Sequence, residues 1–130
     1  MSWEKAVARR LLADGAVAAL VAQRVDWDER EQRAPMPAVV LQLISDPRPQ
    51  NMDGFDPIRP SRVRINCLSK DKAESAALRE AVIAALVGEG TFDGIWFDRA
   101  TVDAVRPLGE RTDTGFVHRE AVDIIFWHEG

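Results

Sequence analysis

The two histidines and the single cysteine are the side chains of this chain best suited to bind a transition metal. His118 and His128 lie ten residues apart in a segment that alternates as a strand does, so both would share one face. A strand rises about 3.3 Å per residue, which separates the two rings by about 33 Å. Zinc ligands must surround one ion, and Cys67 could join only one of the histidines. We therefore expect no metal site, with both histidines facing solvent or a partner.

A second candidate is the group of carboxylates Asp46, Asp53 and Asp56. Such a group could hold a cation or act as a general acid and base. The pattern of alternating Asp residues and a terminal Glu that typifies a calcium loop is absent. Each of these residues stands before a Pro or a Gly, which is ordinary turn chemistry. We interpret them as turn residues, and a small hydrolase that uses them is the less favoured alternative.

The sequence offers little for nucleophilic catalysis or phosphate binding. The candidate serines lack the Gly-x-Ser-x-Gly pattern of an exposed nucleophile; they are Ser45, Ser61, Ser69 and Ser75. Cys67 falls on the apolar face of an expected strand, which indicates an inert core thiol. Gly88-Glu89-Gly90 lacks the other glycines of a phosphate loop and follows a helix instead of preceding one. We predict a protein that is not an enzyme, with no catalytic, cofactor-binding or metal-binding residues and no cofactor.

The composition indicates one folded domain, residues 1–130. Hydrophobic residues make up 46% of the chain and charged residues 29%, which is ordinary for a folded cytosolic protein. The net charge of -4 and the pI near 5.2 argue against sequence-specific nucleic-acid binding, which needs a basic face. No apolar run approaches the roughly 20 residues of a membrane span, and the first residues lack a signal-peptide pattern. We expect no membrane, a cytoplasmic location and, with one cysteine, no internal disulfide.

Two helices are expected at the N-terminus. Residues 3–20 are rich in Ala, Leu and Arg, which are good helix formers, and Ser2 is suited to cap the first helix. Asp14-Gly15 predicts the end of that helix, with the glycine in the left-handed conformation. A short second helix is then expected over residues 16–21.

The next part of the chain contains a strand between two irregular segments. Residues 24–33 are a charge-dense connector with Trp27 as its apolar anchor. Residues 38–44 are nearly continuous in apolar, β-forming residues, which indicates a strand covered on both faces. Residues 46–60 contain four of the seven prolines, so we predict a long loop without regular structure. Loops of this length in a compact domain are usually functional or disordered.

A one-sided strand followed by a helix comes next. In residues 62–68, Val63, Ile65 and Cys67 share one face, while Arg62, Arg64 and Asn66 share the other, which we assign to solvent or a partner. Asp71 and Glu74 form a variant of the capping box at the start of the helix. The packing stripe of this helix is expected to comprise Leu78, Ala81, Val82, Ala85 and Leu86, with its end at Gly88 or Gly90.

The C-terminal part is expected to form a pair of strands. Residues 95–106 predict one strand, residues 107–115 a polar turn, and residues 115–129 a long final strand. The resulting order is ααββαββ. Short connections within each strand pair favour an α+β fold, in which a four-stranded, mostly antiparallel sheet has helices packed on one face.

Four blocks of this sequence, taken in order and spacing, resemble the tail completion, or tail-to-head joining (tail terminator), proteins of long-tailed bacteriophages, prophages and gene transfer agents. The resemblance runs nearly end to end. The blocks are the Ala-rich N-terminal helix with residues 16–21 and Arg24-Val25; residues 36–42; residues 62–67 with Lys72-Ala73-Glu74; and residues 112–119 with residues 122–128.

The resemblance implies a structural virion protein without catalytic residues. It implies a homo-hexameric ring that ends the tail tube and joins the tail to the head. The partners would be further copies of the chain, the major tail tube protein and the head-tail connector or stopper protein. The location would be the head–tail junction of the virion tail, with the host cytoplasm during assembly. The alternative is a small dimeric ligand-binding or regulatory α+β module without catalysis.

The long loop is our candidate for an assembly surface in such a ring. A ring needs one patch of a subunit to meet a different patch of its neighbour. The loop carries apolar side chains that a merely solvated loop does not need, and it could become ordered on contact. We assign the contact to Met52, Phe55 and Ile58, with Arg48 and Asp56 as charges at its rim. The alternative is a plain mobile loop.

Overall fold

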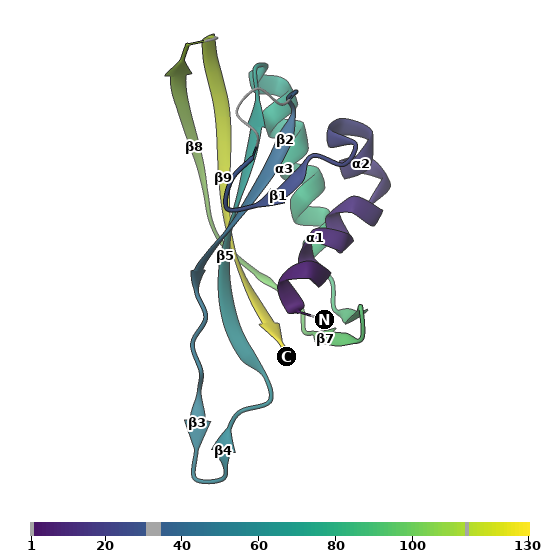
Figure 1. Cartoon of the computed structure of the whole chain (residues 1–130), viewed down its shortest axis with the longest axis vertical. Helices are drawn as coiled ribbons and strands as arrows, with labels where there is room; N and C mark the ends of the chain where they lie inside the picture. Colours follow the sequence, from purple (N-terminus) through teal and green to yellow (C-terminus); the bar gives the residue numbers. More distant parts are fainter. Residues whose placement is uncertain (1, 31–34, 114) are drawn as a thin grey trace.

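The computed structural model describes residues 2–30, 35–113 and 115–130. Twelve elements occur in these ranges (Figure 1). They are α1 (Trp3–Ala13), α2 (Gly15–Val21), β1 (Val25–Trp27), β2 (Ala38–Ser45), β3 (Gln50–Asn51), β4 (Gly54–Phe55), β5 (Arg59–Ser69), α3 (Lys72–Leu86), β6 (Gly90–Phe92), β7 (Ile95–Phe97), β8 (Thr101–Thr112) and β9 (Gly115–His128). No helix in the described ranges is long and apolar enough to cross a membrane.

The sheet is larger than the sequence predicts. Seven strands form one curled sheet in the order β1-β2-β5-β9-β7-β6, and β8 pairs with β9 beside β7. The sheet is mixed, because β1 runs parallel to β2 while the other neighbours are antiparallel. Strands take up 47% of the described residues and helices 27%, so the chain is mostly β. The expected four-stranded α+β sheet of order ααββαββ is therefore wrong.

The missed strands are short or lie at an edge. β1 falls inside the expected connector of residues 24–33, of which residues 31–33 lie outside the described ranges. The expected strand over residues 95–106 is two strands, β7 and β8. Most of the expected turn over residues 107–115 belongs to β8, which runs to Thr112; Thr114 lies outside the described ranges. An exposed edge strand needs no apolar alternation, so its sequence can look like a loop.

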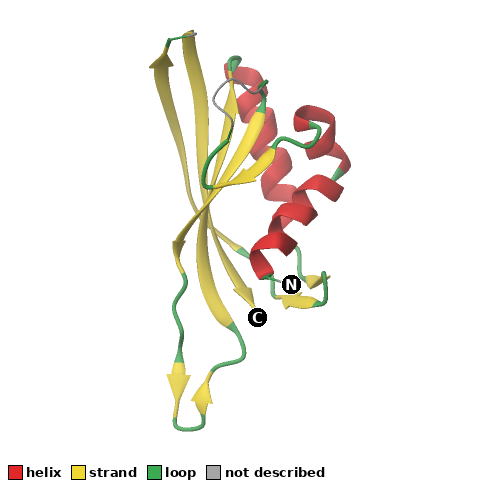
Figure 2. Ribbon diagram, viewed as in Figure 1, coloured by secondary structure: helices red, strands yellow, loops and turns green. Residues whose placement is uncertain are grey.

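The helices lie on one side of the sheet (Figure 2). The N-terminal caps of these helices largely agree with the sequence prediction. The Ser2 side chain accepts a hydrogen bond from the Lys5 N–H at the start of α1. Asp14 ends α1 and caps α2 through the N–H groups of Ala16 and Val17, so Gly15 is the first residue of α2 and not a left-handed cap. The positive φ of 55° occurs at Ala22, after α2.

The start of α3 differs in one contact from the predicted capping box. Asp71 accepts a hydrogen bond from the Ala73 N–H, as expected of the N-cap. Glu74 instead accepts a hydrogen bond from the Ser69 hydroxyl, at 2.7 Å. This contact ties the first turn of α3 to the end of β5, which orients the helix on the sheet.

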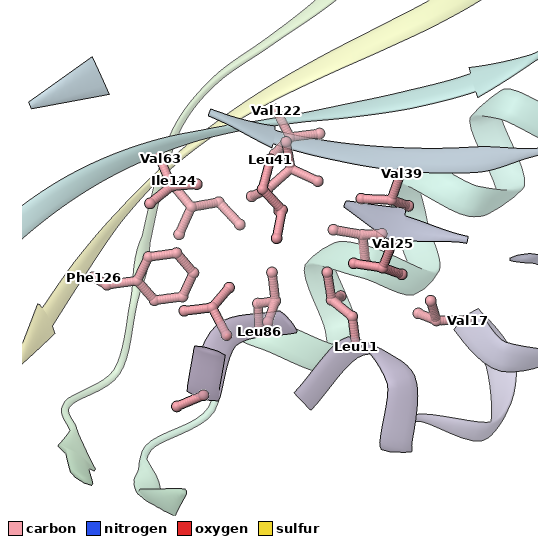
Figure 3. Packing of buried hydrophobic residues seen from close by; sticks show 14 of the residues in the cluster. Leu11, Val17, Val25, Val39, Leu41, Val63, Leu86, Val122, Ile124 and Phe126 are labelled. Atoms are coloured by element: carbon pink, nitrogen blue, oxygen red, sulfur yellow. The ribbon is translucent and has the colours of Figure 1, made fainter. Parts of the chain in front are cut away.

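The core lies between the helices and one face of the sheet. Val63, Ile65 and Cys67 of β5 are fully buried on this face, as their alternation predicts. Figure 3 shows Leu11 of α1 and Leu86 of α3 pointing toward the strand residues, among them Ile124 and Phe126 of β9. The opposite face carries Arg62 and Arg64 as the sequence indicates, but Asn66 on that face is buried, so the expectation of a solvent- or partner-facing side chain is wrong for Asn66.

A buried arginine holds the C-terminal end of α3. Arg10 of α1 is 7% exposed, and its Nη2 donates to the carbonyl oxygens of Ala85, Leu86 and Gly88. Its guanidinium lies 3.9 Å from the centroid of the Phe92 ring. The last carbonyls of a helix carry partial negative charge, which a cation stabilises. Burial lowers the pKa of Arg10 to about 10, so the group stays charged at neutral pH.

Candidate assembly surface

The segment from Asp46 to Pro60 projects from the sheet, and we call it the arm (Figure 1). The sequence predicts no regular structure here, but the arm contains a short hairpin of β3 and β4. Gln50 pairs with Phe55 and Asn51 with Gly54, so the connecting loop is Met52-Asp53. Gly54 has a φ of 119°, a conformation that side chains other than glycine rarely adopt. The arm is therefore a hairpin with a defined tip.

Apolar side chains stand at the tip without cover. Met52 is 104% exposed and Phe55 68% exposed, the two largest values among the exposed large hydrophobic residues. Ile58 is half-buried nearer the root of the arm. Exposing such side chains to water is unfavourable, by about 25 cal/mol for each Å². The tip therefore has the character of a contact surface that its own chain does not complete.

Both charged residues expected at the rim make their polar contacts within the arm. Arg48 pairs with Asp46 at 2.9 Å, and the Asp56 carboxylate accepts a hydrogen bond from the Asn51 side chain at 2.7 Å. Arg48, Pro49, Phe55, Asp56 and Arg59 line a hollow of about 210 Å³ on the side of the arm. Arg48 and Asp56 are both exposed, so their role at the rim of an interface stays a prediction.

The root of the arm is fixed by Asp46. Its carboxylate accepts hydrogen bonds at 2.8 Å from the Arg59 guanidinium and from the Ser61 hydroxyl, which both lie on the returning strand. Burial alone would raise the pKa of Asp46, but these hydrogen bonds and the nearby arginine charges outweigh it and lower the pKa. The outgoing and returning segments of the arm are thus joined where they leave the sheet.

Asp46, Ser61 and His128 come together at this root, which the sequence does not suggest. The Ser61 hydroxyl oxygen lies 2.7 Å from His128 Nε2 and 2.8 Å from an Asp46 oxygen. In a hydrolytic triad the histidine bridges the serine and the carboxylate. Here the serine stands in the middle, and Ser61 and His128 are both fully buried. The arrangement is therefore structural, and the carboxylate of Asp46 serves the fold of the arm.

The expectation that both histidines face solvent or a partner is wrong for His128. Its ring stacks on Trp3 with centroids 4.3 Å apart, and it also lies against Phe97. Trp3 is 2% exposed, so it packs into the core. His118 is half-buried and meets the edge of the Phe116 ring. The contact between Trp3 and His128 cannot be predicted from the sequence alone, because the two residues come from opposite ends of the chain.

The burial of His128 predicts a pH-dependent stability. Burial lowers the pKa of the His128 ring below the value of about 6.5 in the unfolded chain. Between these two pKa values the unfolded chain binds more protons than the folded chain. The free energy of unfolding should therefore be highest above pH 6.5 and fall as the pH drops through the pKa of folded His128.

Urea denaturation between pH 5 and pH 7.5 measures this dependence. His128→Gln should flatten the slope in this range. His118→Gln changes the same residue type on the same strand, leaves the contact with Trp3 intact, and should keep the slope. An equal slope in the His128 variant and the parent would contradict the assignment.

The charged side chains on the sheet face away from the helices are paired with one another. Asp123 of β9 accepts hydrogen bonds from Arg64 and Arg62, and Arg62 also pairs with Asp103. The hydrogen bond from Arg64, with the charges of both arginines, lowers the pKa of Asp123. Because the arginines are neutralised within the sheet, they do not form a basic stripe that would attract nucleic acid.

Two other candidates from the sequence are a metal site and the thiol of Cys67. No group of three or more His, Cys, Asp or Glu residues in residues 2–30, 35–113 and 115–130 could hold a metal ion. Cys67 is buried, so its predicted place in the core is confirmed, and burial raises the pKa of its thiol to about 12, which disfavours the reactive thiolate.

Comparisons with known proteins identify the class of the chain. Residues 5–123 match the family model described as tail completion protein gp17. The chain thus belongs to the tail completion protein gp17 family, a family of structural phage tail proteins and not of enzymes. The family resemblance seen in the sequence is confirmed, and the chain is a structural component of a phage-like tail.

A solved structure has the same fold. It is described as the virion of a native gene transfer agent particle, and a chain in it matches with a TM-score of 0.67 at 18% identity. The match covers 98% of this chain and 94% of the other. No curated protein matches the chain.

Proposed function

We propose that copies of this chain form a hexameric ring that ends the tail tube and joins the tail to the head connector. The match to the tail completion family over residues 5–123 carries this proposal. A protein that completes a tail must contact the last ring of the tube and the component that follows it. The partners are accordingly further copies of the chain, the major tail tube protein and the head-tail connector or stopper protein. Assembly takes place in the host cytoplasm.

The arm supports the proposal because a closed ring requires heterologous contacts, in which two different patches meet. Met52 and Phe55 at its tip are exposed, and the ion pair of Asp46 with Arg59 holds its root. An arm with a fixed root loses less conformational freedom on binding than a mobile loop does. We assign the arm, with Arg48, Asp56 and Ile58 at its sides, to an interface within the assembled tail end.

Immunogold labelling of intact particles tests the proposed position. Antibody raised against this chain should label the junction of head and tail, and particles from a strain that lacks the gene serve as the control. Label at the far tip of the tail, or along its whole length, would contradict the proposal. The match to a family of structural tail proteins favours this function over the alternative of a dimeric ligand-binding module.

A further inference from the structure

The hairpin of β8 and β9 carries apolar side chains that the fold leaves uncovered. Val102 is 37% exposed, while Val105 and Phe116 are each 42% exposed. Val102 lies opposite Ile124 and Val105 opposite Val122, so both point to the side of the sheet that forms the core. Phe116 follows the same alternation along β9. We call Val102, Val105 and Phe116 the hairpin strip.

The Phe116 ring is held in place by its neighbours. Gly109 lies across the strand pair from His118, two pairs away from Phe116 on the same face, and a Cβ atom added at Gly109 would overlap the Phe116 ring. The ring thus lies against the glycine, and His118 meets it edge-on with centroids 4.9 Å apart. A ring that is already fixed loses little entropy when a partner covers it. Phe116 therefore has the properties of an anchor in an interface.

A free sheet edge usually invites another strand, but β8 is poorly suited to this. Within the described part of the chain β8 pairs only with β9. Pro107 has no N–H to donate, and the register with β9 shifts between Val102 and Ala104. Prolines and bulges on an edge strand prevent pairing with further strands. A partner of this hairpin should therefore bind the side chains of the strip and not extend the sheet.

The tip of the arm is apolar like the hairpin strip, and the charge beside it is opposite to the charge beside the strip. Met52 and Phe55 supply apolar surface, and between them stands Asp53, whose carboxylate has no ion pair among the described residues. Arg111 lies opposite Phe116 at the end of the strip, is exposed, and likewise has no ion pair in the described ranges. Each surface thus offers apolar side chains beside a charge that has no ion pair among the described residues, and these two charges are opposite.

The shape of the molecule allows this contact only between copies. The tip of the arm and the tip of the β8–β9 hairpin lie at opposite ends of the long axis (Figure 1). They cannot meet within one chain, but they can meet when copies follow one another head to tail. Such a contact joins two different patches, which is the kind of interface that closes a ring.

We propose that the arm tip of one copy docks on the hairpin strip of the next copy. Met52 and Phe55 pack against the Phe116 end of the strip, while Asp53 pairs with Arg111. This inference rests on the proposed ring and names its subunit interface. It also places the long axis of each subunit along the circumference of the ring.

Charge reversal tests the docking, with the capping of purified tail tubes as the readout. Asp53→Arg and Arg111→Asp each place like charges against each other, and each should raise the protein concentration for half-maximal capping at least about tenfold. An equal mixture of the two variants should restore capping, because alternating copies place opposite charges against each other at every interface. Both changes in one chain should restore capping as well. The unfolding midpoints of the variants are compared first, so that loss of fold is not mistaken for loss of docking.

The outcomes of the charge-reversal test distinguish the docking contact from the proposed function. Wild-type capping by both single variants would overturn the docking and leave the ring intact. Defects that neither the mixture nor the double variant repairs would also overturn it, since the charges would then meet other partners. Failure of the wild-type protein to cap tubes would instead overturn the proposed function.

A disulfide test gives an independent readout. His118 lies beside Phe116 on the same face of the hairpin, so Met52→Cys and His118→Cys proteins, assembled together on tubes and oxidised, should form crosslinked dimers. Neither protein should do so alone, and the buried Cys67 thiol stays unreactive. Absence of the crosslink on capped tubes would overturn the contact.

Discussion

Replacing Phe126 by alanine should lower the free energy of unfolding by about 3 to 5 kcal/mol, a large part of the stability of a domain of this size. Phe126 is fully buried in the core, and its ring meets that of Phe97 edge-on with centroids 6.0 Å apart. Alanine would leave a cavity bounded by rigid strands and helices, which cannot close over it. Urea denaturation at pH 7.5, above the range in which His128 titrates, gives the free energy directly.

Phe116→Ala is the matched control, because the two phenylalanines belong to the same strand and the same face of the sheet. Phe116 is 42% exposed, so its removal should cost less than about 1 kcal/mol. Its effect should fall on assembly instead. Equal destabilisation by the two substitutions would show that the core does not lie under the helices as described.

Replacing Met52 by aspartate should abolish most of the capping of tail tubes while the domain stays folded. Met52 is fully exposed at the tip of the arm, so the change has little to disturb in the isolated chain. In an interface it would place a charge on apolar surface, and the loss of a central contact typically costs about 2 kcal/mol or more, about a thirtyfold loss in affinity. Phe55→Ala should act in the same direction with a smaller effect. The protein concentration for half-maximal capping measures both.

Leu12→Asp provides the comparison for the arm. Leu12 is 36% exposed on α1, far in sequence from the arm, and the substitution makes the same kind of change. It should leave capping near the level of the parent. Undiminished capping by the Met52 variant, or an equal loss in the Leu12 variant, would refute the arm as an assembly surface.

The parts of the fold that could be predicted from the sequence are those in which one short segment carries the whole pattern. The alternation of Val63, Ile65 and Cys67 identifies the core face of β5 without any other element. Ser2 and Asp71 reach N–H groups two or three residues away, so the caps of α1 and α3 are local as well. The family resemblance extends this local information to the class of protein.

The parts that could not be predicted depend on contacts between distant segments. β1 is three residues long and exists because it pairs in parallel with β2. β8 is almost wholly exposed, so no apolar period reveals it. The burial of His128 results from Trp3, and the hydrogen bonds of Asp46 result from residues more than ten positions away. Spacing along the chain contains none of this information, so the sequence indicates only a solvent- or partner-facing His128 and a turn residue at Asp46.

The most direct test of the proposed role at the tail end is electron microscopy of particles from a producing strain in which this gene is deleted. We expect heads filled with DNA but without tails, beside loose tails of irregular length, because the tube would lack both its end and its joint to the head. Expression of the parent chain from a plasmid should restore tailed particles, whereas the Met52→Asp chain should not. Normal tailed particles in the deletion strain would show that this chain neither ends the tail tube nor joins the tail to the head.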